Sequence, residues 1–283
     1  MTGEHPDYNS TASAIARRAG ALLMEYFVRG VKTEYKGAGT VDIVTDADRA
    51  SEKLIIESLR AAFPDHGIVG EEGSRSQIAG EYIWYVDPLD GTTNFAHGFP
   101  IFCVSIGLAR NNEVVAGVVY DPSRNELFAA QRGRGATLNG ERIHVSKISK
   151  LGESLLGTGF PSKKRHLNPN IYFYHQLTMK SHGIRRAGSA ALDLACVASG
   201  RYEGFWEFNL NAWDTAAGAL LVEEAGGTLT YIDGSKFDVA ESREVLATNG
   251  IIHRELMAEM KAVMEGRGIE VLPSPMEFAK SRG

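Results

Sequence analysis

The sequence predicts a layered α/β protein, in which sheets and helices pack in alternating layers. The chain has 283 residues, of which 43% are hydrophobic and 23% charged, and this suits one large folded domain or two closely joined ones. The first half carries a segment rich in β-branched residues and punctuated by hairpin-type turns, whereas the second half alternates short strands with helices. We place a soft boundary between the halves near residues 145–153.

Helices are expected wherever apolar residues recur with a helical period. The first spans residues 8–28, and the second begins after Thr45 and ends near Phe63, because Pro64 cannot continue a helix. Four more are expected in the second half, over residues 168–181, 189–199, 214–226 and 251–264.

Strands are expected where β-branched and aromatic residues cluster between turn signals. In the first half they lie at residues 66–70 and 82–87 and through the segment 101–145, whose Asn111-Asn112 and Asn139-Gly140 pairs suit tight hairpin turns. In the second half they are expected near residues 154–158, 184–187, 203–207, 228–232 and 244–248. Residues 1–7 and 272–283 are expected to form polar tails.

The charge balance and the apolar pattern exclude some classes of function. Thirty Lys and Arg residues against thirty-five Asp and Glu residues leave a net charge of −5, which argues against a basic surface for duplex DNA. We therefore do not expect nucleic acid as a direct ligand. The longest mostly apolar run, residues 101–109, is far too short to span a membrane, and the first ten residues do not resemble a signal peptide. We expect a cytoplasmic protein.

The most informative segment places two acids around a proline at the end of a predicted strand. In Asp87-Pro88-Leu89-Asp90, proline favours an extended Asp87, and the chain then turns through Asp90-Gly91. The two carboxylates and the Leu89 carbonyl can face one point, which is the all-oxygen ligand mixture that Mg²⁺ prefers. If a helical turn begins at Thr92, its N–H groups can hold a phosphate beside the metal. An ordinary turn is the structural alternative.

Three further acidic positions fit the same site, although each has a structural alternative. Glu71-Glu72 follows a short strand, and only one of the two side chains can face a common centre; a solvated turn is the alternative. Asp214 opens an apolar helix, where it could simply be the N-cap. Asp48 stands three residues after Thr45, which is the spacing of a capping box.

Four segments in this order resemble the motifs of the inositol monophosphatase family, and the resemblance covers residues 10–265. The motifs are VDIVTDAD at 41–48, GEEG at 70–73, WYVDPLDGTTNFAH at 84–97 and WDTAAGALLVEEAGG at 213–227. Membership implies a five-layer α/β/α/β/α sandwich. It also implies one catalytic unit, made of an N-terminal part over residues 8–146 and a C-terminal part over residues 147–268 that completes the metal and substrate site.

The resemblance implies Mg²⁺-dependent hydrolysis of a phosphate monoester, with two to three ions bound. The implied metal ligands are Glu71, Asp87, the Leu89 carbonyl, Asp90 and Asp214. Asp48, Thr92 and Glu71 are the implied catalytic residues, Asp48 and Thr92 as the pair that orients and deprotonates the attacking water. The implied substrate-binding residues are Gly91 and Thr92 for phosphate, and Gly188, Ser189, Ala190 and Glu207 for the rest of the substrate. A basic residue near the metals corresponds to Lys36.

The substrate that the resemblance favours is inositol-1-phosphate, because Glu207 would accept hydroxyl hydrogen bonds and repel a second phosphate. Related folds hydrolyse fructose 1,6-bisphosphate, 3′-phosphoadenosine 5′-phosphate or histidinol phosphate, and these remain alternatives.

Some bacterial relatives also act as regulatory partners of the RNA-handling machinery. A homodimer and inhibition by lithium are further implications. The basic residues 163–166 and the pair Arg185-Arg186 could face an anionic substrate or only solvent.

Overall fold

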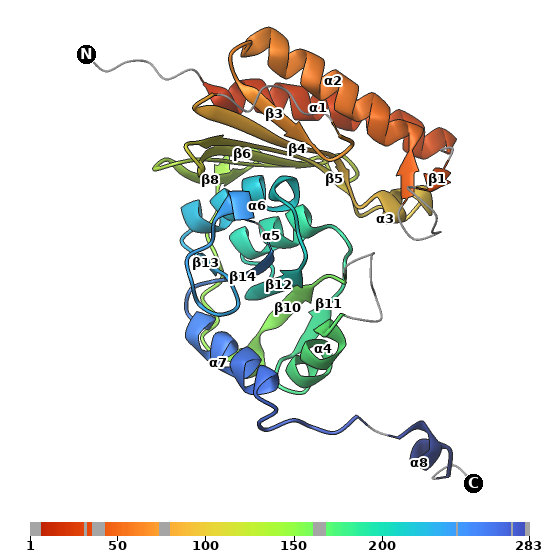
Figure 1. Ribbon diagram of the computed structural model, residues 1–283, viewed down its shortest axis with the longest axis vertical. Helices are drawn as coiled ribbons and strands as arrows, with labels where there is room; N and C mark the ends of the chain where they lie inside the picture. The colour runs from red at the N-terminus through yellow and green to blue at the C-terminus, as the bar shows by residue number, and fades with distance from the viewer. Residues whose placement is uncertain are drawn as a thin grey trace.

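The computed structural model describes residues 7–30, 33–35, 43–73, 80–160, 168–241, 243–272 and 274–280. Figure 1 shows two sheets with helices between them and on both outer sides. The helices are α1 Tyr8–Arg29, α2 Asp46–Ala62, α3 Thr92–Ala96, α4 Asn170–Thr178, α5 Ala190–Ala198, α6 Ala212–Glu224, α7 His253–Met264 and α8 Pro275–Lys280. Short 3₁₀ turns lie at Leu151–Glu153 and Val239–Glu241.

The strands fall into a large first sheet, a second sheet and a small hairpin. Those of the hairpin are β1 Thr33–Tyr35 and β2 Ile43–Thr45. Those of the first sheet are β3 Gly67–Gly70, β4 Tyr82–Asp90, β5 Cys103–Arg110, β6 Glu113–Asp121, β7 Glu126–Gln131, β8 Gly135–Leu138 and β9 Glu141–Arg142. Those of the second sheet are β10 Leu155–Thr158, β11 Gly183–Arg185, β12 Gly204–Phe208, β13 Thr228–Thr230 and β14 Glu244–Thr248.

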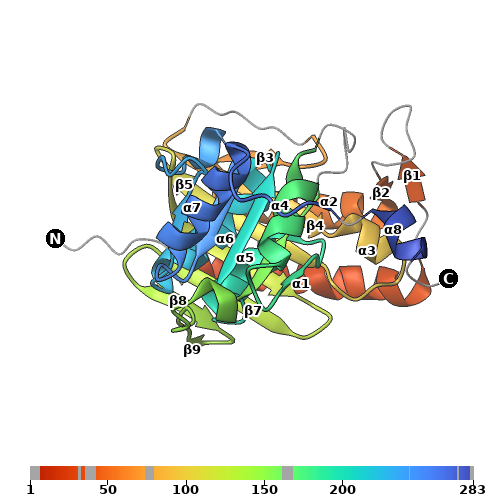
Figure 2. The same cartoon turned by 90° about the horizontal axis from the view of Figure 1, so that it is seen from below.

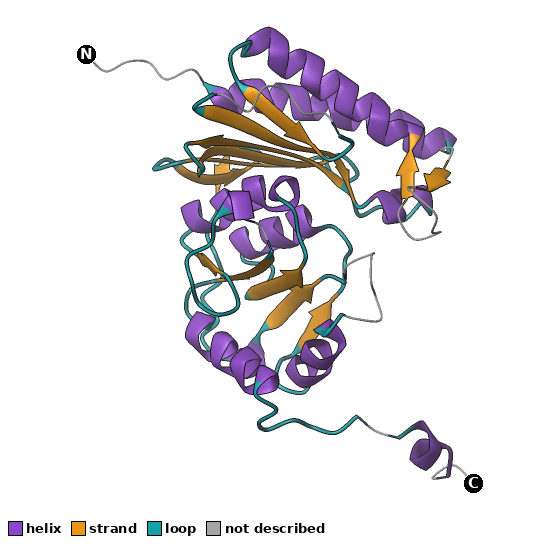
Figure 3. Cartoon of the chain, in the orientation of Figure 1, coloured by secondary structure: helices purple, strands orange, loops and turns teal. Residues whose placement is uncertain are grey.

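The layers stack in the order helix, sheet, helix, sheet, helix, which confirms the predicted five-layer sandwich. Helices α1 and α2 cover the outer face of the seven-stranded sheet, and α5 and α6 lie between the two sheets. Helices α4 and α7 pack together on the far side of the five-stranded sheet (Figure 3). The acidic motif of β4 therefore lies next to the central helical layer, which contains Asp214 of α6.

The first sheet is antiparallel apart from the parallel pair β3 and β4. Its hairpins follow the predicted turn chemistry, because Asn111 and Asn112 adopt φ angles of 50° and 66°, and Asn139 and Gly140 adopt 50° and 88°. In the second sheet, β12 pairs parallel with β10 and antiparallel with β14. The carboxyl ends of β10 and β12 therefore lie side by side.

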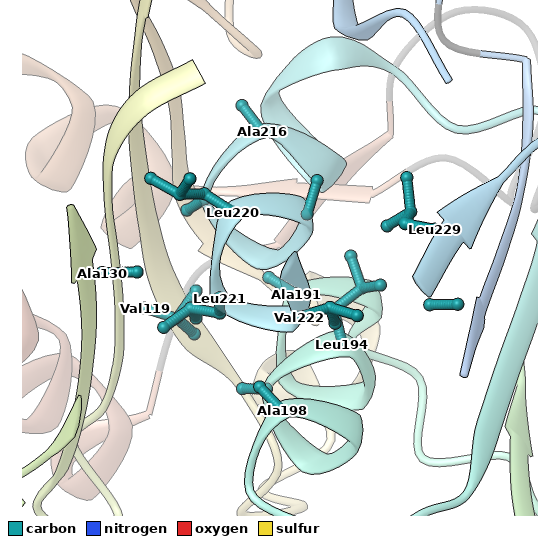
Figure 4. Close-up of a cluster of buried hydrophobic side chains, with 14 of the residues drawn as sticks. Val119, Ala130, Ala191, Leu194, Ala198, Ala216, Leu220, Leu221, Val222 and Leu229 are labelled. Atoms are coloured by element: carbon teal, nitrogen blue, oxygen red, sulfur yellow. The ribbon is translucent and has the colours of Figure 1, made fainter. Parts of the chain in front are cut away.

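The central helices pack closely on the first sheet because glycines on neighbouring strands leave room for them. A Cβ atom at Gly107 would lie 2.6 Å from Cβ of Ala216, and one at Gly117 would lie 2.9 Å from Cα of Ala217. Figure 4 shows the core that results, in which Leu221 of α6 lies beside Val119 of the sheet and Leu220 belongs to the same cluster. The start of α6 is thus held against the strands that carry the acidic motif.

Several predicted bounds differ from the structure, such as those of the helix expected over residues 168–181, which is α4. Three of the differences have an identifiable reason. Strand β4 does not end at Asp87 but continues to Asp90, because a shift in its pairing with β5 absorbs the proline. Helix α6 begins at Ala212, two residues early, because Asn211 rather than Asp214 is its cap. Residues 275–280, predicted as part of a polar tail, form α8. This helix lies apart from the body in Figure 1 and therefore overlaps it when the molecule is seen from below in Figure 2.

Candidate active site

The acidic segment of β4 is fixed by hydrogen bonds to its own backbone and to α2. Asp87 Oδ1 accepts the N–H of Leu89 at 3.0 Å, and the Ser51 hydroxyl donates to the Pro88 carbonyl at 2.8 Å. Gly91 then adopts a left-handed conformation with φ 99° and starts α3. A Cβ atom there would lie 2.8 Å from the Ile101 carbonyl oxygen, so only glycine fits this turn. Asp87, Asp90 and Thr92 are thereby gathered at one corner.

Asp87 lies at the centre of a cluster of carboxylates that come from both halves of the chain. It is buried. Burial first, and then the negative charges of Glu71, Asp90 and Asp214, raise the pKa of Asp87 well above its usual range. Two carboxylates about 4 Å apart repel by roughly 4 kcal/mol at an effective dielectric near 20. The four acids therefore need protons or cations to remain together, and their all-oxygen chemistry fits a hard divalent cation.

Asp90 and Asp214 each use one carboxylate oxygen for hydrogen bonds to other residues of the protein. Asp90 Oδ2 accepts the Ser189 hydroxyl and the Ala191 N–H, both at 2.7 Å. Asp214 Oδ2 accepts the backbone N–H of Asn211 at 2.6 Å and its side-chain amide at 3.2 Å. Burial and the charge of Asp90 raise the pKa of Asp214 to about 8. These bonds are all made to Oδ2, so Oδ1 of each carboxylate is the oxygen better placed to bind a cation.

The cluster is open rather than closed around one point. Within the part of the chain that the structure describes, no three acidic, His or Cys side chains enclose a ready-made metal shell. Binding a divalent cation here would require the carboxylates to move closer together, and the charge of the cation would offset their mutual repulsion.

Asp48 combines the two roles that the sequence left open. Its Oδ2 accepts the N–H of Thr45 at 2.8 Å and the Thr45 hydroxyl at 2.5 Å, which completes the capping box of α2. Its Oδ1 accepts the Thr92 hydroxyl at 3.0 Å, and that hydroxyl also lies 3.1 Å from the Leu89 carbonyl. Burial raises the pKa of Asp48, while the hydrogen bonds from Thr45 and Thr92 lower it. The cap therefore fixes the carboxylate that faces Thr92.

Glu207 comes from the second sheet and reaches the same region. Burial and the charges of Asp214 and Asp90 raise the pKa of Glu207 to about 8, and Arg186 acts in the opposite direction. Its carboxylate lies over Gly159, where a Cβ atom would stand 2.0 Å from Oε2. Gly159 follows β10, so this glycine leaves the space that the carboxylate occupies.

The segment 188–190 joins the two halves at the site. Gly188 adopts φ 87°, and a Cβ atom there would lie 2.7 Å from Arg186 Nη1. Ser189 is buried, caps α5 and gives its hydroxyl to Asp90, so its side chain positions an acid; Ala190, also buried, opens α5. Asn94 of α3 donates to the Ala187 carbonyl at 2.8 Å and to the Ile101 carbonyl at 2.9 Å.

Sequence reasoning missed three supporting residues, namely Ser51, Asn94 and Asn211. Asn211 carried a usable signal, because Asn211-x-x-Asp214 has the same capping spacing as Thr45-x-x-Asp48. Ser51 and Asn94 bond to carbonyls distant in sequence, and no local pattern marks such contacts. Lys36 and the basic residues 163–166 lie outside the described residues.

We expect Gly159→Ala to displace Glu207 without unfolding the protein. The added methyl group collides with a carboxylate at the end of a flexible side chain, and Gly159 does not need a left-handed backbone. Loss of the Glu207 contact should lower kcat/KM for a hydroxylated substrate about tenfold, as expected for a hydrogen bond to a charged group. Steady-state kinetics with a thermal melt check this, and unchanged kcat/KM in a folded variant contradicts it.

Taken together, the fold and the site define a class: a layered α/β protein with a carboxylate cluster for divalent cations beside a turn suited to phosphate. The chain belongs to the inositol monophosphatase family, because the family's sequence profile matches residues 7–265.

Individual relatives agree with this assignment. A Nus factor SuhB from Pseudomonas aeruginosa is 45% identical over 252 residues, which cover 87% of this chain and 93% of the relative. An inositol-1-monophosphatase from Synechocystis sp. is 45% identical over 246 residues, or 86% of this chain and 85% of the relative. The solved inositol monophosphatase from Anabaena (Nostoc) sp. is 42% identical with a TM-score of 0.81, covering 90% of this chain and 95% of that one.

Proposed function

We propose that this protein is a Mg²⁺-dependent phosphatase that hydrolyses inositol-1-phosphate to myo-inositol and phosphate. The observation that carries the proposal is the buried Asp87, surrounded by three other carboxylates and followed by the Gly91 turn. Family membership and the relatives named inositol-1-monophosphatase support the reaction and the substrate.

The residues suited to hold Mg²⁺ are Glu71, Asp87, Asp90, Asp214 and the Leu89 carbonyl. All of them offer oxygen, and each of Asp90 and Asp214 keeps one oxygen away from its local hydrogen bonds. When bound, the ions neutralise phosphate charge and favour water attack and departure of the leaving oxygen. The chain is proposed to bind two to three ions.

The chain's own residues would position the water and accept its proton. Because the Thr92 hydroxyl donates toward Asp48, its oxygen is free to accept a hydrogen bond from the water. Asp48 can then receive the proton through Thr92, and Glu71, whose charge acts on Asp87, would assist. The N–H groups of Gly91 and Thr92 would hold phosphate oxygens. Glu207, with Gly188, Ser189 and Ala190, would hold the polyol.

The first test is phosphate release from myo-inositol 1-phosphate, with Mg²⁺ and with a chelator. We expect rapid release with Mg²⁺ and loss of release in excess chelator, restored by adding Mg²⁺. Fructose 1,6-bisphosphate, 3′-phosphoadenosine 5′-phosphate and histidinol phosphate are the comparison substrates. Release from one of these with none from inositol phosphate would reassign the substrate, and no release from folded protein with any of them would refute the proposal.

A regulatory binding role is the second candidate, because several relatives are named as a Nus factor SuhB rather than as a phosphatase. Such a role would be independent of chemistry, so partner association should survive Asp90→Asn. Association that disappears in this variant would argue against the candidate.

The proposal also covers the catalytic unit, the oligomeric state, the localisation and the inhibition of the protein. We infer one catalytic unit made of residues 8–146 and 147–268, which functions as a homodimer in the cytoplasm and is inhibited by Li⁺. Analytical ultracentrifugation measures the oligomeric state directly. None of the helices in the described ranges combines the length and apolar character needed to cross a bilayer.

A further inference from the structure

Helix α5 contains one acidic residue, Asp193, that the proposed chemistry does not use. The other residues of the helix are alanine, leucine, valine and cysteine. Asp193 is 1% exposed, and neither of its carboxyl oxygens has a hydrogen-bond partner in the described part of the chain. Burying a carboxyl group without partners is costly. An apolar residue would pack better here, so a purely structural role does not explain Asp193.

The charged groups that act on Asp193 include two acids of the proposed site, Glu207 and Asp90. After burial, the charge of Glu207 is the largest influence that raises the pKa of Asp193, followed by Asp90, while Arg186 lowers it. Arg186 acts on Glu207 in the same way. Asp193 and Glu207 therefore share one electrostatic environment.

Helix α5, which carries Asp193, packs on the strand that carries Glu207, β12. Helix α5 contacts β10 and β12. Two glycines of the β10 segment lack side chains here: a Cβ at Gly157 would lie 2.8 Å from the Tyr202 ring, and one at Gly159 would meet the Glu207 carboxylate. The charge of Asp193 raises the pKa of Tyr202 as well. Asp193 and Glu207 therefore lie on two elements that pack together, α5 and β12, and their charges act on each other.

We propose that Asp193 is a positioning residue that acts through Glu207: its buried carboxyl group fixes the charge and orientation of the Glu207 carboxylate toward substrate hydroxyls. Of two neighbouring buried acids, one retains a proton more readily than an isolated acid does. A protonated Asp193 has an O–H to offer to Glu207, directly after side-chain rotation or through one water. Glu207 then stays an acceptor. This inference rests on the proposed function, since it concerns how that site selects hydroxylated substrates.

The test compares two substrates in matched variants assayed with Mg²⁺. Asp193→Ala removes the carboxyl group from a helix already rich in alanine, and Asp193→Asn keeps its size and a donor. On myo-inositol 1-phosphate we expect Asp193→Ala to lower kcat/KM about tenfold, mainly through KM, as for other residues that orient a ligand-binding group. Asp193→Asn should stay within about threefold of wild type. On p-nitrophenyl phosphate, which lacks hydroxyls, both variants should match wild type.

A double-mutant cycle and a melt separate positioning from structure. If Asp193 acts through Glu207, Asp193→Ala should have almost no further effect in the Glu207→Gln background. The melting temperature of Asp193→Ala should equal or exceed that of wild type, because the substitution removes a carboxyl group whose burial is costly. Equal losses on both substrates, additive losses in the cycle, or unchanged inositol phosphate kinetics would overturn the inference.

The two proposals fail in different ways. Wild-type protein that does not hydrolyse inositol phosphate contradicts the proposed function. Active wild type, a selective loss in Glu207→Gln and no loss in Asp193→Ala contradict only the role of Asp193.

Discussion

Asp90→Asn and Asp214→Asn should each lower kcat by at least about 100-fold while the protein stays folded. Charge stabilisation by a bound metal is worth several kcal/mol in the transition state, and about 1.4 kcal/mol corresponds to a factor of ten. The fold should survive because asparagine keeps one acceptor oxygen. That oxygen can still accept from Ser189 and Ala191 at position 90, or from Asn211 at position 214. The amide NH₂ group then takes the place of the cation-facing oxygen and cannot bind Mg²⁺.

Asp233→Asn is a matched control for these variants. Asp233 also accepts a local N–H and a hydroxyl, both from Ser235, at 2.8 Å and 2.5 Å, but it is exposed and distant from the cluster in the sequence. Its kcat should equal that of wild type. Turnover by Asp90→Asn or Asp214→Asn that remains at the wild-type level in saturating Mg²⁺ would show that these carboxylates do not serve the reaction.

The fold was predictable from the sequence wherever local chemistry decides structure. Helix α2 follows from a capping box at Thr45 and a proline after Phe63, and the hairpins follow from asparagine and glycine in left-handed turns. Strand β4 is longer than predicted. The sequence suggests that the strand ends before Pro88, but its pairing with β5 continues to Asp90 with a shift of register. Tertiary contacts of this kind leave no periodic pattern in a single sequence.

Some residues of the candidate site could be predicted from the sequence, and others could not. Asp87, Asp90 and Gly91 lie within one short motif, so their convergence follows from local geometry. The pairing of Ser189 with Asp90 joins residues 99 positions apart, and only the packing of α5 against the first sheet brings them together. In the sequence, Asp193 is simply a polar residue within an apolar helix. Only the structure shows that both of its carboxyl oxygens are buried.

Thr92→Val should lower kcat by about 100-fold or more, whereas Thr92→Ser should retain most of the activity. Valine has the shape of threonine but lacks the hydroxyl that links Asp48 to the water position, and loss of general-base assistance typically costs about 10²–10⁴-fold. Asp48 itself should stay in place, because the N–H and hydroxyl of Thr45 still hold its other oxygen.

Thr93→Val controls for the effect of a valine in α3, since Thr93 is the exposed neighbour of Thr92. Its kcat should match that of wild type.

The hydrogen bond between Thr92 and Asp48 predicts that Asp48→Asn and Thr92→Val are non-additive in kcat, because either substitution alone breaks the same proton path. Strictly multiplicative losses would mean that Asp48 and Thr92 act separately. Equal losses in the valine and serine variants would mean that the hydroxyl alone does not account for the role of Thr92 in turnover.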